Sequence, residues 1–145
     1  MKKPPRVALG TDHAGYALKE IIKKHLIDQG IDVIDEGTFS EEPPVDYPAI
    51  IRKACAVVLE QQCPGIVFGG SGIGESIAAN KVRGIRAARC CTVEDATLTR
   101  QHNDANILSL GGRMLDPELA KKMVDTFLTT DFEGGRHVKR IADLE

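Results

Sequence analysis

The sequence of 145 residues contains no tryptophan, and only 4% of its residues are aromatic. This scarcity argues against the aromatic stacking platforms with which proteins bind single-stranded nucleic acid. Acidic and basic residues are intermixed and the formal net charge is −2, so the basic patch of a nucleic-acid or anionic-membrane binder is also missing. No apolar run approaches the ~20 residues that cross a bilayer, and no signal-peptide core follows the basic start. We expect no nucleic-acid partner, no membrane and a cytoplasmic location.

The four cysteines lack the spacing of a metal site. Cys90 and Cys91 adjoin in a segment with strand character, where neighbouring side chains point to opposite faces and do not easily bridge each other. Cys55 and Cys63 form no Cys-x-x-Cys or Cys/His pattern with them. We therefore predict buried free thiols, no structural zinc and no metal site.

Strand and helix signals alternate along the chain. Short apolar runs at 6–10, 31–35, 65–68, 85–91 and 107–111 read as strands. Helical spacing or helix punctuation follows each run, at 17–30, 49–62, 76–82, 93–104 and 117–128, and a last short helix lies in the tail. Five β-α units in series predict an α/β fold: a doubly wound, Rossmann-like sheet of five mostly parallel strands, with helices on both faces and a single domain over 1–145.

A glycine-rich loop is the most informative local feature. It runs from Gly69 to Gly74, between a buried strand and a helix that opens with Glu75. Free backbone N–H groups at such a turn hold an oxyanion or a phosphate. A carboxylate beside them can remove a proton from a carbon next to a carbonyl. The helix dipole alone could also explain the glutamate. The spacing fits neither G-x-G-x-x-G nor a P-loop, so a nucleotide is not expected.

Other polar residues fall at the same predicted edge of the sheet. Asp12 and His13 follow the first strand and Arg113 follows the fifth, where ligands of doubly wound sheets bind. Asp12 and His13 could instead simply form a turn. In the tail, Arg136 and Arg140 lie one helical turn apart and could clamp a phosphate dianion, although a solvated basic face is the simpler alternative.

Five blocks of sequence together resemble the ribose-5-phosphate isomerase type B family, which includes galactose-6-phosphate isomerase subunits. The blocks are 10–15 (GTDHAG), 45–48 (VDYP), 69–81 (GGSGIGESIAANK), 99–106 (TRQHNDAN) and 133–137 (EGGRH). They are spread over nearly the whole chain. The resemblance implies that the protein interconverts ribose 5-phosphate and ribulose 5-phosphate in a homodimer, or a dimer of dimers, without metal or nucleotide cofactor.

The resemblance also assigns roles by position. Many members use a cysteine base where this chain has Gly69, so the chain matches the branch in which Glu75 moves the proton. By the same comparison, the N–H groups of Gly70, Ser71, Gly72, Ile73 and Gly74 hold the oxyanion. Ser71 and Asp12 handle sugar hydroxyls, and His102 opens the ring. The phosphate is surrounded by His13, Arg113, Arg136 and Arg140. In the family, His102, Asn103 and Arg113 reach a neighbour's pocket.

Three functions remain open at this stage. The leading one is the pentose-phosphate isomerase of the non-oxidative pentose phosphate pathway. A second keeps the chemistry but acts on allose or galactose 6-phosphate, which needs a longer pocket. A third is a non-catalytic module that binds a sugar phosphate, which has no need of a base beside an oxyanion trap. His102 also has a plain alternative, because a histidine at a helix C-terminus can simply interact with the helix dipole.

Overall fold

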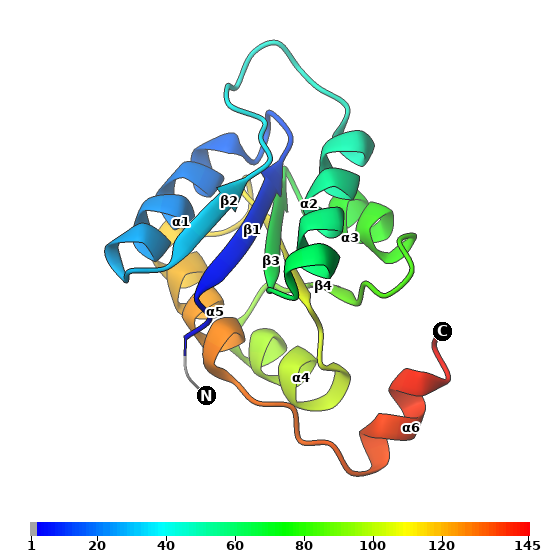
Figure 1. The fold of residues 1–145 in the computed structure, drawn as a ribbon. Coiled ribbons are helices and arrows are strands. Elements are labelled where there is room, and N and C mark those ends of the chain that lie inside the picture. Colours follow the sequence, from blue (N-terminus) through cyan, green and yellow to red (C-terminus); the bar gives the residue numbers. More distant parts are fainter. Residues whose placement is uncertain (1–2) are drawn as a thin grey trace.

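The computed structural model describes residues 3–145 as one parallel sheet in the order β2-β1-β3-β5-β4 (Figure 1). The strands are β1 (Arg6–Thr11), β2 (Asp32–Asp35), β3 (Gly65–Gly69), β4 (Ala87–Arg89) and β5 (Ile107–Gly111). The helices are α1 (Tyr16–Asp28), α2 (Tyr47–Gln61), α3 (Ile73–Asn80), α4 (Val93–Asn103), α5 (Pro117–Thr129) and α6 (Arg136–Ala142). The predicted doubly wound α/β class is confirmed, and all four strand pairings are parallel.

Two apolar cores cover the two faces of the sheet. The larger core joins alternate residues of β1, β3 and β5, such as Leu9 and Phe68, to α1, α4 and α5. The other core joins the intervening residues, such as Ala8 and Val67, to α2 and α3. Because neighbouring side chains of a strand point to opposite faces, a strand buried on both sides is apolar except where a polar side chain finds a hydrogen-bond partner. This explains why β3 is an unbroken apolar run and why β5 is apolar apart from Ser109.

The strand order changes direction between β1 and β3. From β1 the chain moves outward to β2, and it then returns to place β3 on the other side of β1. The carboxyl ends of these strands face the top of Figure 1, beneath the loop that joins β2 to α2. Ligands of doubly wound sheets bind above such a switch point, because the loops diverge there and leave a crevice.

Some boundaries differ from the sequence prediction. Helix α2 begins at Tyr47 rather than at 49, because Pro48 is accommodated in the first helical turn. Helix α3 begins at Ile73 rather than at 76, which shortens the glycine loop. Strand β4 covers only Ala87–Arg89, on the half-exposed edge of the sheet, so Cys90 and Cys91 follow the strand instead of lying in it. All four cysteines are free, and Cys91 is only half-buried.

A fully buried lysine ties α1 to the end of β2. Nζ of Lys19 donates to Asp35 at 2.7 Å and to the carbonyl of Thr38 at 3.0 Å. Lys23 also donates to Asp35, at 3.0 Å. Burial raises the pKa of Asp35, but the hydrogen bonds from Lys19, the Gly37 N–H and Lys23 outweigh it, and the pKa lies below its usual value. This ion pair fixes the start of the loop that overhangs the switch point.

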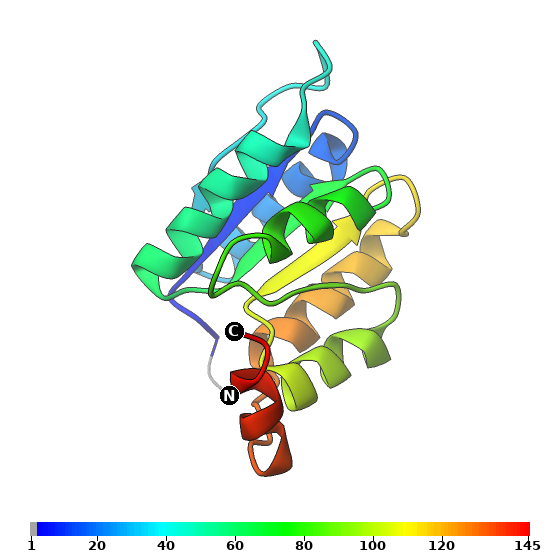
Figure 2. The same ribbon diagram turned by 90° about the vertical axis from the view of Figure 1, so that its right-hand side faces the viewer.

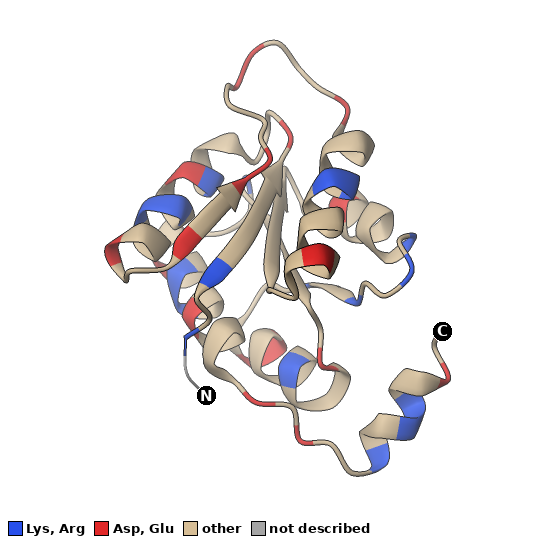
Figure 3. Cartoon of the chain, in the orientation of Figure 1, with Lys and Arg blue, Asp and Glu red and all other residues tan. Residues whose placement is uncertain are grey.

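Helix α6 lies apart from the sheet. It packs against α4 below the amino ends of the strands, at the end of the molecule opposite to the switch point (Figures 1 and 2). Basic residues are prominent along this short helix (Figure 3). No helix within residues 3–145 is long and apolar enough to cross a membrane.

Candidate active site

A cleft of about 500 Å³ opens at the carboxyl ends of β1, β3 and β5. Its walls come from the turns that follow these strands and from the first residue of α2. The lining residues are Asp12, His13, Ala14, Tyr47, Gly70, Ser71, Gly74, Glu75, Arg113 and Met114. The cleft thus joins the three corners that the sequence placed at one edge of the sheet.

The glycine loop is pinned from below by β4 and β5. Gly72 has a φ of +81°, and a Cβ at this position would lie 3.0 Å from the backbone of Leu110, so only glycine fits without strain. Oγ of Ser109 donates to the Gly72 carbonyl at 2.7 Å, and Nε of Arg89 donates to the Ser71 carbonyl at 2.9 Å. Because the carbonyls of Ser71 and Gly72 are bound to β4 and β5, the N–H groups of the loop are left on the side of the start of α3.

The side chain of Ser71 caps the next turn. Its Oγ accepts a hydrogen bond from the N–H of Ile73 at 3.2 Å. The N–H of Ile73, one of the predicted oxyanion donors, is therefore engaged with a side chain that itself lines the cleft.

The carboxyl of Glu75 lies at the floor of the cleft. The residue is only 4% exposed, and its carboxyl occupies the space into which a side chain at position 69 would project. A Cβ on Gly69 would collide with it. The buried position of the Glu75 carboxyl therefore requires a glycine at position 69, because any larger side chain there would occupy the same space.

The environment of Glu75 raises the pKa of its carboxyl. Burial is the largest cause, and the neighbouring carboxyl of Asp12 adds to it through its charge and a hydrogen bond. A hydrogen bond from the Glu75 backbone N–H acts in the opposite direction but does not prevail. A helix N-terminus favours the ionised carboxylate and so opposes burial, but burial has the larger effect on the pKa of Glu75.

Asp12 and His13 are held by backbone groups on both sides. Asp12 accepts a hydrogen bond from the N–H of Gly15 at 3.0 Å, which makes it the turn former as well as a cleft residue. Nδ1 of His13 accepts from the N–H of Val45 at 3.1 Å. An accepting Nδ1 carries no proton, so neutral His13 is protonated at Nε2 and can donate there.

Arg113 lies in the cleft of its own chain. Its backbone N–H donates to the Gly70 carbonyl at 3.0 Å, and Nη1 of its guanidinium lies 3.3 Å from the place of a Cβ on Gly70. The family resemblance implied that Arg113 reaches a neighbour's pocket, whereas in the single chain Arg113 lines the cleft of its own subunit. The reason is its position directly after β5, which is paired with β3.

His102, Asn103, Arg136 and Arg140 do not line this cleft. His102 and Asn103 end α4, and the two arginines belong to α6, at the opposite end of the sheet (Figure 1). The single chain therefore does not bring these four predicted site residues to Glu75.

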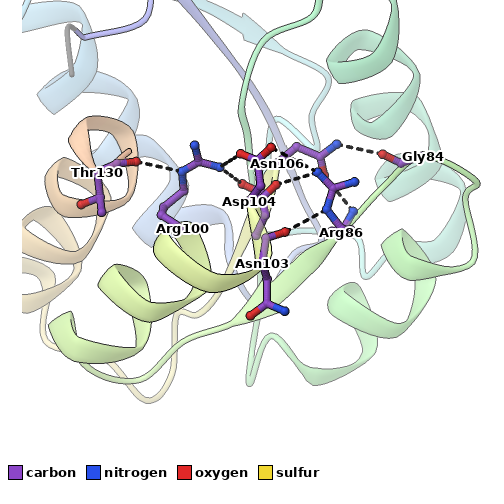
Figure 4. Close-up of polar contacts among 8 residues, drawn as sticks. Gly84, Arg86, Arg100, Asn103, Asp104, Asn106 and Thr130 are labelled. Carbon is purple, nitrogen blue, oxygen red and sulfur yellow. Dashed lines mark hydrogen bonds and ion pairs between the residues drawn. The ribbon is translucent and has the colours of Figure 1, made fainter. Parts of the chain in front are cut away.

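Two half-buried arginines nevertheless fix the end of α4 (Figure 4). Arg86 donates to the carbonyls of Asn103 and Asp104 at 2.9 and 2.8 Å. Arg100 donates to Asp104 and to the carbonyl of Ala105 at 2.8 and 2.7 Å. The side-chain amide of Asn103 points away from this network (Figure 4). The hydrogen bonds of Arg86 and Arg100 thus hold the end of α4 in place, and the Asn103 side chain points outward from it.

The cysteines take no part in the cleft. Burial raises the pKa of Cys55 to about 11 and that of Cys90 to about 12, so these thiols stay protonated and unreactive at neutral pH.

The sequence analysis assigned no role to Tyr47, Ala14 or Met114, which line the cleft. Tyr47 had left a signal, because it lies in the block 45–48 that carried the family resemblance.

Comparisons with known proteins point in one direction. A family model described as Ribose/Galactose Isomerase matches residues 7–144. Ribose-5-phosphate isomerase B of Escherichia coli is 47% identical over 137 residues, which cover 94% of this chain and 91% of that protein. The crystal structure of a ribose 5-phosphate isomerase from Thermotoga maritima superimposes with a TM-score of 0.93 at 49% identity and covers 96% of both chains.

A third relative was solved with a sugar phosphate. Ribose-5-phosphate isomerase B of Mycoplasma genitalium, with bound ribulose-5-phosphate, has a TM-score of 0.91 and 37% identity. The match covers 96% of this chain and 93% of that one.

Proposed function

Because the chain belongs to the ribose/galactose isomerase family, we propose that it is a ribose-5-phosphate isomerase in which Glu75 is the base. The reaction converts an aldose phosphate into a ketose phosphate by moving one proton between adjacent carbons. The observation that supports this role most strongly is the buried Glu75 carboxyl, with its raised pKa, under a glycine loop at the switch point of the sheet. A base that works near neutral pH needs such a shift.

Glu75 removes the proton from C2 of open-chain ribose 5-phosphate and returns it to C1. In between, the carbonyl oxygen at C1 carries the negative charge of an enediolate, and the proton of the C2 hydroxyl passes to this oxygen, so that C2 becomes the carbonyl and C1 the alcohol. N–H groups of the loop 70–74 hold that oxygen, a contribution worth about 3–4 kcal/mol per donor in other enzymes. Ser71 and Asp12 bind sugar hydroxyls. Asp12 also adjoins the Glu75 carboxyl, so it acts on the base itself.

The phosphate binds at the outer part of the cleft. His13 offers the Nε2–H that its contact with Val45 dictates, and Arg113 offers a guanidinium on the other side of the glycine loop. Arg forks match phosphate oxygens in geometry and charge. Arg136 and Arg140 complete the phosphate site from a second copy of the chain.

In a homodimer with shared sites, the cleft of one chain and the residues at the opposite end of the other chain form one active site. His102, Asn103, Arg136 and Arg140 lie at the opposite end of the same chain, so a partner copy has to supply them. Ile73 and Ile77 of α3 are 48% and 57% exposed, and Met114 at the rim of the cleft is 58% exposed. Large exposed apolar side chains beside the cleft are suited to a subunit interface, in a dimer or in a dimer of dimers.

Mixing two inactive variants tests the sharing of sites. E75Q and H102Q, unfolded together and refolded as a mixture, form hybrid dimers in which one site keeps both wild-type residues. Random pairing then restores about a quarter of the wild-type activity, because half of the dimers are hybrids with one intact site of two. Recovery of no activity, in a mixture shown by light scattering to be dimeric, contradicts shared sites.

The pH profile tests the environment of Glu75. Because its pKa is raised, kcat/KM is expected to fall with decreasing pH around a midpoint above the usual value of about 4.3 for glutamate. Replacing the neighbouring Asp12 with asparagine removes the charge that helps to raise this pKa, so the midpoint moves down even though the rate drops. An unchanged midpoint in D12N contradicts the coupling of the two carboxyls.

The remaining predictions follow from family membership. The activity needs no metal or nucleotide, so turnover of ribose 5-phosphate is expected to persist in the presence of a chelator. We also propose that residues 1–145 form a single catalytic domain in the cytoplasm, acting in the non-oxidative pentose phosphate pathway.

A further inference from the structure

Three side chains far from the cleft bring possible metal ligands together. His102 lies in the last turn of α4, Glu133 precedes α6, and His137 lies in α6. Their ligand atoms all lie within 4.8 Å of one another. Oε2 of Glu133 is 3.9 Å from Nε2 of each histidine, too far for a hydrogen bond. The three groups thus face one another without satisfying one another.

The Nε2 atom of the buried histidine of this cluster has no hydrogen-bond partner among residues 3–145. The side chain of His137 is only 7% exposed, and its Nε2 is the buried side-chain nitrogen or oxygen that has no hydrogen-bond partner within residues 3–145. Buried polar atoms are nearly always paired, and an unpaired one costs free energy. This atom faces Glu133 and belongs to the same cluster as His102, so it points into a place where a ligand would satisfy it.

Two imidazoles and a carboxylate are a donor set that Zn²⁺ and similar divalent transition-metal ions prefer. Bonds of about 2.0–2.2 Å to a tetrahedral ion require ligand atoms about 3.3 Å apart. The two distances from Glu133 to the histidines are a little longer, at 3.9 Å, and the two histidine nitrogens lie within 4.8 Å of each other. The rings of His102 and His137 stack at 4.6 Å with 17° between their planes, so the His102 ring must tilt to share an ion. The side chains of His102 and Glu133 are 36% and 47% exposed, which leaves room for this adjustment.

Some charged groups around the cluster favour the binding of a cation, and others oppose it. Burial lowers the pKa of His137, as do Arg136, His102 and Arg140, whereas Glu133 raises it. A neutral imidazole is the form that binds a metal. The same two arginines repel a cation, so Glu133 supplies the one negative charge of the set. Its loss is expected to weaken binding strongly.

We propose that His102, Glu133 and His137 form a binding site for a divalent transition-metal ion of the zinc class, and that the bound ion inhibits the enzyme. The metal takes the lone pair of His102 Nε2 and prevents it from exchanging a proton with the sugar ring. The inhibition rests on the proposed role of His102, whereas the binding does not. Sequence spacing does not reveal this site, because Glu133 and His137 are four residues apart but the third ligand, His102, comes from α4.

Calorimetric titration of the full-length protein with ZnCl₂ tests the site. One ion per chain is expected to bind, and E133Q and H137Q are each expected to weaken the affinity at least about tenfold, which is the lower end of the effect of losing even an outer-shell partner. Glu133 is exposed, so E133Q tests the proposal even where H137Q disturbs the fold. Absence of saturable binding to the wild type, or equal affinity in E133Q, overturns the proposal.

Two control variants remove other possible ligands of Zn²⁺. His25 contacts Asp125 at 2.8 Å on another part of the surface, and Cys91 is the half-buried thiol. H25Q and C91S are expected to keep the wild-type affinity. A tenfold loss in either one relocates the ion and overturns the proposal.

An activity assay with ribose 5-phosphate tests the consequence. Zn²⁺ is expected to inhibit the wild type over the concentration range in which it binds, and E133Q is expected to need at least about tenfold more metal, in line with its weaker binding. Binding without inhibition leaves the metal site standing but overturns the inhibitory part of the proposal. That result also counts against His102 as the ring-opening group, so the two failures are distinguishable.

Discussion

E75Q is expected to lower kcat by about 10²–10⁴-fold, the range that general acid–base catalysis contributes in other enzymes. Glutamine has nearly the shape of glutamate but cannot accept the proton from C2. The phosphate contacts of His13 and Arg113 are untouched, so binding of ribose 5-phosphate is expected to change little. Calorimetric binding and a turnover assay on the same sample measure both quantities.

Loss of folding is not expected to explain this result. A carboxyl whose pKa is raised in the folded state stabilises the protein below its unfolded pKa, and this contribution is lost as the pH rises through the folded pKa. Ionised Glu75 therefore costs stability at neutral pH, and E75Q is expected to be at least as stable as the wild type there. The matched control is E60Q, an exposed glutamate on α2, which should leave kcat unchanged. Substantial turnover by E75Q would remove Glu75 from its role.

K19M is expected to lower the free energy of unfolding by about 3–5 kcal/mol, the usual cost of removing one partner of a buried ion pair. The Lys19 side chain is fully buried and that of Asp35 is 7% exposed, so water does not replace the lost ammonium. Lys23 remains beside Asp35 and is better exposed to solvent. Denaturant titration at neutral pH measures the difference.

The pH dependence of this loss identifies its cause. The pKa of Asp35 is lowered in the wild type, so its ion pair contributes stability above the unfolded pKa of about 3.9 and loses it as the pH falls further. The gap between K19M and the wild type is therefore expected to shrink in acid. K24M is the control, because Lys24 and Asp28 are 76% and 60% exposed and such pairs contribute at most about 1 kcal/mol. Equal losses in K19M and K24M contradict the account of the buried pair.

The sequence was sufficient to assemble most of the cleft. Parallel β-α units put the carboxyl ends of β1, β3 and β5 at one edge, so Asp12, the glycine loop with Glu75, and Arg113 were grouped correctly before the structure. This succeeds because backbone topology alone decides which turns meet. Strand β4 was predicted too long, because it lies at the half-exposed edge of the sheet and pairs with β5 only from Ala87 to Arg89, although β5 itself continues to Gly111.

Other features depend on contacts that no sequence pattern encodes. The protonation of His13 at Nε2 follows from a backbone N–H of Val45, which arrives by way of an irregular loop. The direction of the Glu75 pKa shift follows from the depth of burial and from the approach of Asp12. The cluster of His102, Glu133 and His137 arises where α6 packs against α4, so the four-residue spacing of Glu133 and His137 alone does not reveal it.

Proton exchange at the substrate carbon tests the central role of Glu75 most directly. The wild type, incubated with ribose 5-phosphate in D₂O, is expected to place deuterium at C1 of ribulose 5-phosphate, as followed by proton NMR. E75Q, saturated with the same substrate, is expected to incorporate none over the same period. Deuterium incorporation by E75Q at a rate near that of the wild type would show that another group removes the proton, and the proposed mechanism would be wrong.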